Sequence, residues 1–253
     1  MSTPFHVIIP ARFGASRLPG KPLLDVAGRP LIQWVWDCAR ASGAASVIVA
    51  TDDARVRSVA AAFGADVAMT SAGHVSGTDR VAEVVRARAL TPEAIVINLQ
   101  GDEPLMPPAL VARVAAALVE HPDCGIATAA APISSVAEFL DPSCVKALRS
   151  LRGEALYFSR ACVPWPRDAT TADRPSDFTH ALRHIGIYGY RVKSLLEFAG
   201  WPPTPLETTE KLEQLRALEH GMRIHVVALQ EAPPAGVDTP EDLEAVRARL
   251  RAR

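Results

Sequence analysis

Short apolar runs alternate with amphipathic stretches through the first half of the chain. The runs have the length and apolar content of buried strands, at residues 5–9, 46–50, 66–69, 94–99 and 126–131. Between them, apolar positions recur at helical spacing and predict helices at 30–41, 53–63, 79–89 and 108–119. Because strands and helices alternate, we expect an α/β fold with a doubly wound, mostly parallel sheet of the Rossmann-like kind.

The second half of the chain is less regular. A hairpin is predicted around Arg152-Gly153, with strands at 145–148 and 155–157, and further strands are predicted at 183–190 and 223–229. A helix is predicted over 209–220, with a solvated polar face made of Glu210, Glu213, Gln214 and Ala217. A capping box at 239–242 opens the last helix. We therefore expect one domain, residues 1–253, with a mixed α+β elaboration in its second half.

A loop that carries glycines and cations follows the first predicted strand, over residues 10–23 (PARFGASRLPGKPL). Loop glycines allow backbone N–H groups to approach an anion, and Arg12, Arg17 and Lys21 can neutralise a polyphosphate. Five residues separate Gly14 from Gly20 and a proline follows Lys21, so this is not a Walker loop, and the GxGxxG pattern is missing. The loop predicts a phosphate site; a solvated surface loop is the alternative.

Two distant segments offer carboxylates for a hard cation. NLQGDEP (98–104) places two carboxylates, Asp102 and Glu103, just past a predicted buried strand, and Asp238 lies in GVDTP before the last helix. Carboxylate oxygens of this kind suit Mg²⁺ that bridges protein and phosphate. Each aspartate also has a plain structural explanation, since Asp102 is a common turn former and Asp238 an ordinary acid at a helix start. Sequence spacing alone does not establish that they pair.

The net charge, the apolar runs and the cysteines exclude several classes of partner and site. With 27 basic and 28 acidic residues the formal net charge is −1, so we expect neither nucleic acid nor a membrane surface as a partner. The apolar runs are too short to span a bilayer, and the first residues lack the features of a signal peptide, which makes a cytoplasmic location the expectation. Four scattered cysteines predict neither a zinc site nor a disulfide framework.

Along nearly its whole length, the chain resembles the 3-deoxy-manno-octulosonate (Kdo) cytidylyltransferases, also called CMP-Kdo synthetases. The resemblance rests on the 10–23 loop, SGTDR (76–80), NLQGDEP (98–104), ALYFSR (155–160), LRHIGIYGYR (182–191), EQLR (213–216) and GVDTPEDL (236–243). The first and third segments are shared with related sugar nucleotidyltransferases, and the later ones are more specific. The chain departs from the family's common residues at 13–16 and at Asp79, which affects only fine contacts.

The resemblance implies a nucleotidyltransferase fold and transfer of CMP from CTP to Kdo, with release of pyrophosphate, for lipopolysaccharide biosynthesis. It implies Mg²⁺ as the cofactor, held by Asp102 and Asp238, and a homodimer formed by the second half. Residues 1–135 would then bind mainly nucleotide, 136–235 would bind mainly sugar and dimerise, and 236–253 would form a C-terminal helix.

The resemblance also implies a set of residues for each substrate. The catalytic set is Arg12, Lys21, Asp102 and Asp238. The nucleotide-binding set is Pro10, Ala11, Arg12, Lys21, Ser76, Gly77, Thr78, Asp79, Arg80 and Gln100. The sugar-binding set is Ser159, Arg160, His184, Tyr188, Glu213 and Gln214. Arg or His suits a sugar carboxylate, and the other types suit hydroxyls. Apart from the resemblance, His184 and Tyr188 are more typical of packed core positions.

Three alternatives stay open. A cytidylyltransferase for another acidic sugar, such as a sialic acid, would share the first half of the chain, and the segments around Arg160 and His184 discriminate. Retention of both predicted cations and both aspartates disfavours a catalytically silent, nucleotide-binding subunit on the same fold. The missing glycine fingerprint disfavours a nicotinamide-dependent oxidoreductase.

Overall fold

The structure is a computed structural model that describes residues 3–14, 18–167, 178 and 180–251. Arg17 of the predicted phosphate loop and the polar segment 168–177 lie outside these residues. None of the helices in the described part of the chain has the length and apolar character of a membrane span.

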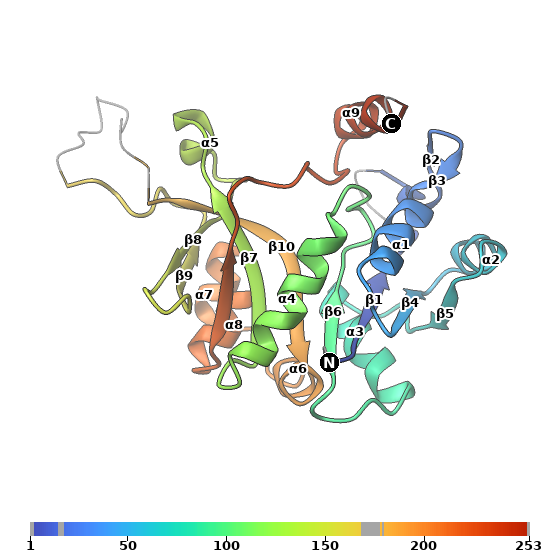
Figure 1. The fold of residues 1–253 in the computed structure, drawn as a ribbon, viewed down its shortest axis with the longest axis horizontal. Coiled ribbons are helices and arrows are strands. Elements are labelled where there is room, and N and C mark those ends of the chain that lie inside the picture. Colours follow the sequence, from blue (N-terminus) through green and yellow to red (C-terminus); the bar gives the residue numbers. More distant parts are fainter. Residues whose placement is uncertain (1–2, 15–17, 168–177, 179, 252–253) are drawn as a thin grey trace.

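One mixed sheet runs through the molecule (Figure 1), with the strand order β11-β7-β10-β6-β1-β4-β5. The strands β1 (Phe5–Pro10), β4 (Ser46–Thr51), β6 (Ile95–Asn98) and the edge strand β5 (Asp66–Met69) are parallel. The strands β7 (Ile126–Pro132) and β11 (Ile224–Ala228) are also parallel to each other. Between the two groups, β10 (Leu182–Arg191) is antiparallel to both of its neighbours. The predicted α/β fold with a mostly parallel sheet is confirmed.

Helices cover both faces of the sheet, which explains why the central strands are apolar on both sides. One core contains residues of α1 (Leu31–Ala41), α2 (Ala54–Ala62) and α4 (Pro108–Glu120). The other contains residues of α3 (Gly77–Ala87), α6 (Val192–Phe198) and α8 (Gln214–Glu219). Since alternate residues of a strand point to opposite faces, Ile9 packs into the first core and Ile8 into the second.

Smaller elements complete the fold beside the sheet. The predicted hairpin is present as β8 (Lys146–Arg149) and β9 (Ala155–Ser159). The hairpin joins the sheet because β8 pairs with β10. The remaining elements are the 3-10 helix η1 (Lys21–Leu23), the hairpin β2 (Asp25–Val26) and β3 (Arg29–Pro30), α5 (Val136–Leu140) and α9 (Pro240–Arg251). Thr239 and Asp242 exchange hydrogen bonds at the start of α9, as the predicted capping box requires.

The single helix predicted over 209–220 is wrong. The structure has α7 (Pro205–Glu210) and α8, separated by Lys211 in the left-handed conformation with φ 54°. A capping box between Thr204 and Glu207 starts α7 early, and Arg216 of α8 forms an ion pair with Glu207, which holds the second helix against the first. The polar face is not solvated either: Gln214 is only 7% exposed, and the other polar side chains have partners elsewhere in the fold.

Candidate functional site

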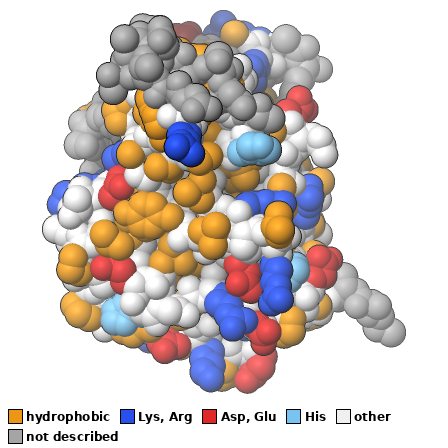
Figure 2. Space-filling model, turned by 90° about the vertical axis from the view of Figure 1, so that its left-hand side faces the viewer, with side chains coloured by type: hydrophobic (Ala, Val, Ile, Leu, Met, Phe, Trp, Pro, Cys, Tyr) orange, Lys and Arg blue, Asp and Glu red, His pale blue; other side chains and the backbone are white. Residues whose placement is uncertain are grey.

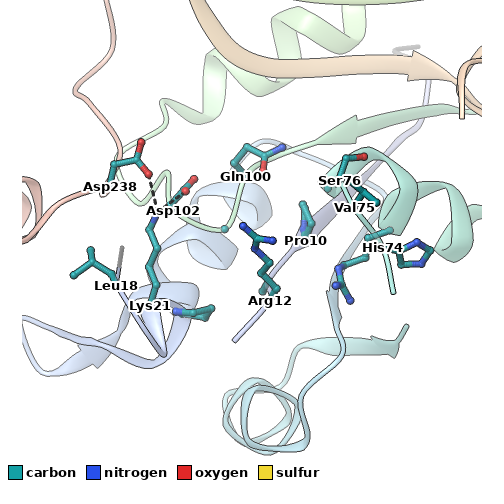
Figure 3. Close-up of a pocket in the computed structure, with 15 residues that line it drawn as sticks. Pro10, Arg12, Leu18, Lys21, His74, Val75, Ser76, Gln100, Asp102 and Asp238 are labelled. Atoms are coloured by element: carbon teal, nitrogen blue, oxygen red, sulfur yellow. Dashed lines mark hydrogen bonds and ion pairs between the residues drawn. The ribbon is translucent and has the colours of Figure 1, made fainter. Parts of the chain in front are cut away.

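An open cavity of about 310 Å³ lies beyond the carboxyl ends of β1 and β6, the edge where ligands bind in such sheets (Figure 3). It is lined by Pro10, Ala11, Arg12, Leu18, Lys21, Pro22, His74, Val75, Ser76, Gly77, Arg80, Gln100, Gly101, Asp102 and Asp238. All of the predicted catalytic residues and all of the predicted nucleotide-binding residues except Thr78 and Asp79 are therefore at this cavity. The predicted site residues did not include five others that line the cavity. Leu18, Pro22 and Gly101 lie within the quoted motifs, and His74 and Val75 directly precede SGTDR.

Two glycines allow the segments around the cavity to approach each other. A Cβ on Gly101 would lie 2.7 Å from the backbone oxygen of Pro10, so only glycine lets the loop after β6 pack on the loop after β1. A Cβ on Gly236 would lie 2.9 Å from the backbone oxygen of Asp102. The N–H of the next residue, Val237, donates to that same oxygen at 2.8 Å. This contact places Asp238 beside Asp102.

The ammonium group of Lys21 lies between the two aspartates. Lys21 Nζ donates to Asp102 Oδ2 at 2.6 Å and to Asp238 Oδ1 at 3.0 Å (Figure 3). The Lys21 side chain is 12% exposed, Asp102 is 33% exposed and Asp238 is 56% exposed, so water screens the pair with Asp238 more than the pair with Asp102. The structure thus brings a cation from the first loop and carboxylates from two distant segments to one point, as the sequence hypothesis required.

Glu103, the second carboxylate of NLQGDEP, is a partly buried acid beside this cluster. Burial first, and then the negative charges of Asp102 and Asp238, raise the pKa of its carboxyl to about 8. The carboxyl is therefore largely protonated at neutral pH, and it does not add a third negative charge next to the two aspartates. The sequence predicted Glu103 as a possible partner of a hard cation, and its burial and raised pKa are features that only the fold supplies.

The cations at the cavity are not equivalent. Arg12 is exposed and, within the described residues, its side chain makes no hydrogen bond. Arg80 is 3% exposed, its Nη2 donates to Asp52 at 3.0 Å, and it also bonds Thr70, so its charge is already compensated. Among the described residues, Arg12 is consequently the cation at the cavity without an ion pair, whereas Lys21 is paired with Asp102 and Asp238 and Arg80 with Asp52.

The first turn of α3 connects the cavity to the predicted sugar-binding residues. The helix begins at Gly77, two residues before its predicted start, and Ser76 and Asp79 form a capping box. Asp79 is therefore engaged in capping rather than at the cavity. Thr78 points away as well, and its hydroxyl donates to Glu213 Oε2 at 2.7 Å. Burial raises the pKa of the Glu213 carboxyl.

None of the six predicted sugar-binding residues lines the cavity. Ser159 and Arg160 are at the end of β9, His184 and Tyr188 are on β10, and Glu213 and Gln214 are at the start of α8. Tyr188 pairs with Asn98 on β6, whose side chain accepts a hydrogen bond from Gln100 of the cavity. The buried Nε2 of Gln214 and Oε1 of Glu213 have no hydrogen-bond partner among the described residues, which is the condition expected of groups that bind a polar ligand.

His184 does not carry the positive charge that was one reason for assigning it to a sugar carboxylate. Its Nε2 lies 3.0 Å from the Thr128 hydroxyl, and its ring contacts those of Phe158 and Tyr188. Loss of hydration in these surroundings lowers the pKa of His184 to about 4, so the imidazole is neutral at pH 7. It is suited to a hydrogen bond with a hydroxyl rather than to an ion pair.

This shift predicts a loss of stability in acid. The pKa of His184 is about 4 in the folded protein and 6.5 in a free imidazole, so the unfolded chain takes up the proton first as the pH falls. Stability present above pH 6.5 is therefore lost progressively toward pH 4, by about 2 kcal/mol at pH 5 for this residue. Urea unfolding at pH 7.5 and pH 5 measures the difference, which should shrink in His184→Gln. The same substitution at the exposed His180 is the control, and an unchanged difference in His184→Gln would contradict the assignment.

Comparisons with known proteins are consistent from end to end of the chain. Residues 6–224 match the protein family described as Cytidylyltransferase. The chain is 54% identical over 255 residues to 3-deoxy-manno-octulosonate cytidylyltransferase of Pseudomonas syringae pv. tomato, with all of both chains covered. It is 56% identical to the enzyme of the same name from Halorhodospira halophila, with 99% of each covered. A solved structure of CMP:2-keto-3-deoxy-manno-octonic acid synthetase complexed with CTP is 43% identical, covers 99% of each chain and has a TM-score of 0.88.

Proposed function

This chain belongs to the family of 3-deoxy-manno-octulosonate cytidylyltransferases, and from that premise we propose that it transfers CMP from CTP to Kdo. The anomeric hydroxyl of the sugar attacks the α phosphorus of CTP in line. The new bond joins the sugar oxygen to that phosphorus, the bond to the bridging oxygen breaks, and pyrophosphate leaves. The hydroxyl proton is released to the solution. The observation that carries the proposal is the convergence of Lys21, Asp102 and Asp238 at one cavity that the phosphate-type loop also lines.

In this reaction the protein mainly has to position the two substrates and to neutralise their negative charge. Four negative charges on CTP and one on the sugar repel each other as the substrates meet. Lys21 and Arg12 are placed to hold phosphate oxygens, and the cytidine lies against Ser76, Gly77 and Gln100. Asp102 and Asp238 are each ion-paired with Lys21, and we propose that they hold a cation and do not act as nucleophiles.

The donor set fits Mg²⁺, which we propose as the cofactor. Asp102 and Asp238 offer hard oxygen ligands on either side of a position where a cation, Lys21 Nζ, is already stable. In the described residues no group of three or more His, Cys, Asp or Glu could hold a metal ion without help. That agrees with Mg²⁺, which is usually bound by one or two carboxylates together with substrate phosphates. When bound, the ion would neutralise charge on the phosphate oxygens.

The sugar is proposed to lie between the cavity and the wall formed by β9, β10 and α8. Arg160 binds the carboxylate of the sugar, because a guanidinium group matches a carboxylate in geometry and His184 is neutral. Glu213 and Gln214 supply buried polar atoms for its hydroxyls. Thr78 links this wall to the nucleotide side through its hydrogen bond with Glu213.

The reaction is tested by pyrophosphate release, measured with each of the four nucleoside triphosphates and a panel of acidic sugars that includes Kdo and a sialic acid. We expect release only with CTP and Kdo, and only with Mg²⁺ present; a chelator should abolish it. Release that is indifferent to the sugar would reject the proposal, and preference for sialic acid would favour the alternative sugar.

A homodimer is also proposed, formed by the second half of the chain. Figure 2 shows apolar side chains gathered across the face that lies at the left of Figure 1, where β8, β9 and α7 are found. Exposed large apolar residues in this part of the fold are Leu151, Leu156, Trp165 and Leu206. An exposed apolar surface of this kind is typical of a protein interface. Light scattering should give twice the mass of one chain; the mass of a monomer at micromolar concentration would refute the dimer.

We further propose that the product enters lipopolysaccharide biosynthesis and that the enzyme acts in the cytoplasm. Membership of the family supports the role in lipopolysaccharide biosynthesis. The cytoplasm is proposed because CTP is available there. Deletion of the gene in its host should reduce Kdo in the lipopolysaccharide, and fractionation should recover the protein with cytoplasmic markers. Normal Kdo content after deletion would contradict the pathway assignment.

A further inference from the structure

The corner at the end of β9 is tied to the end of α7 by a single residue, Glu210. Ser159 Oγ donates to the Glu210 carboxylate at 2.7 Å, and the backbone N–H of Arg160 donates to its other oxygen at 2.9 Å. Arg160 Nε donates to the backbone carbonyl of Glu210 at 2.7 Å. Glu210 therefore holds both the main chain of this corner and one edge of the guanidinium group.

The break between α7 and α8 makes this arrangement possible. In a continuous helix the carbonyl of Glu210 would accept a hydrogen bond from the N–H of Gln214. Because Lys211 adopts the left-handed conformation, the helix ends at Glu210 and this carbonyl is directed to Arg160 instead. A cation at the end of a helix is also favoured by the partial negative charge there.

A buried lysine holds the same corner from another side. Lys146 on β8 has no solvent exposure, and its ammonium donates to the backbone oxygen of Arg160 at 3.2 Å. Its other two hydrogen bonds go to the carbonyls of Asp141 and Cys144, each at 2.8 Å. The backbone N–H and C=O groups of Arg160 are thus both held by charged side chains, one on each side of the corner.

The hydrogen bonds that orient the Arg160 guanidinium do not neutralise its positive charge. Its two hydrogen bonds go to the backbone carbonyls of Glu210 and Pro142, which are neutral. The Glu210 carboxylate is engaged instead with the Ser159 hydroxyl and the Arg160 backbone, and among the described residues Arg160 has no ion pair. The group is oriented by carbonyls while its positive charge is left for an anionic ligand.

We propose that Glu210 is a positioning residue for the acidic sugar, acting through Arg160 and Ser159 without touching the sugar itself. The inference rests on the proposed function, in which Arg160 reads the sugar carboxylate. It assigns to Glu210 a role opposite to the one that its charge alone suggests, since an acid near an anionic substrate would otherwise weaken binding.

Glu210→Gln tests this proposal because it removes the charge and keeps the size. An amide has one acceptor oxygen where the carboxylate has two, so one of the two donors at the corner loses its partner. We expect the KM for Kdo to rise roughly tenfold to a hundredfold, with the KM for CTP and the kcat at saturating sugar close to those of wild type. A merely repulsive acid predicts the reverse, a lower KM for Kdo, and a KM that does not change would also overturn the proposal.

Two controls separate the possible outcomes. Glu197→Gln makes the same change at an exposed position of α6 and should leave both KM values unchanged. In an Arg160→Lys background, adding Glu210→Gln should raise the KM for Kdo little further, whereas effects that multiply would show that Glu210 does not act through Arg160.

A KM for CTP that rises as much as the KM for Kdo would overturn the proposal, because it would mean that Glu210 has a general structural role. If wild type fails to release pyrophosphate with CTP and Kdo, the proposed function fails and this inference fails with it; an active wild type with an unaffected variant overturns this inference alone.

Discussion

Asp102→Asn is expected to lower turnover by about a hundredfold to a thousandfold while the affinity for CTP changes little. Asparagine keeps the shape of the side chain and removes one of the two negative charges that flank Lys21 at 2.6 Å and 3.0 Å. In the proposed function CTP is held mainly by other groups that line the cavity, namely Arg12, Lys21 and the start of α3. The loss should therefore fall on the chemical step, where charge on the phosphates has to be neutralised as the bond breaks.

Single-turnover rates at saturating CTP, Kdo and Mg²⁺, together with calorimetric titration of CTP, separate the two effects. Asp37→Asn is a matched control, because Asp37 is also an ion-paired aspartate, 3.2 Å from Arg29 on a face away from the cavity. The control should turn over like wild type. Near-normal turnover in Asp102→Asn would contradict the role given to this carboxylate.

Lys21→Met is expected to have the second large effect, with turnover reduced about a hundredfold or more and a higher KM for CTP. Methionine has a similar length and no charge. Without the ammonium group, Asp102 and Asp238 face each other uncompensated, so the free protein should bind Mg²⁺ more tightly even as catalysis fails. Affinity for the ion and turnover would thus move in opposite directions.

The shift in melting temperature on adding Mg²⁺ to the free protein reports that affinity without any turnover. The shift should be larger in Lys21→Met than in wild type and should disappear in the double variant with Asp102→Asn. Lys193→Met changes an exposed lysine on α6 and provides the control. If Mg²⁺ stabilised Lys21→Met no more than wild type, Lys21 would not be competing for the position between the two carboxylates.

Features that depend on near neighbours in the chain were predictable. The strands β1, β4, β5 and β6 lie within one or two residues of their predicted ranges, because apolar runs bounded by turn residues are a local signal. The capping box at Thr239 and Asp242 is equally local. The sequence also predicted, from local features, that the loop after β1 and the segment NLQGDEP belong to the site, and residues of both line the cavity.

Other features depend on contacts between residues that are far apart in the chain. Periodicity predicted a continuous helix over 209–220, but Lys211 breaks it because Glu210 and Glu213 have partners on β9 and α3. Lys146 looked like an ordinary strand residue, and only packing made it a buried cation that holds the corner after β9. The pairing of Arg80 with Asp52, which removes its charge from the cavity, has no local signature either.

The amino-acid order was thus sufficient for the alternation of strands and helices, for the motifs that carry the chemistry and for the family. It was insufficient for the spatial relations among those motifs. Asp102 and Asp238 meet because Gly236 lets two loops touch, and Lys21 reaches both from the first residue of η1. Hydrophobic periodicity is set by neighbours a few positions away, whereas the charge, burial and pKa of a side chain are set by whatever the completed fold places against it.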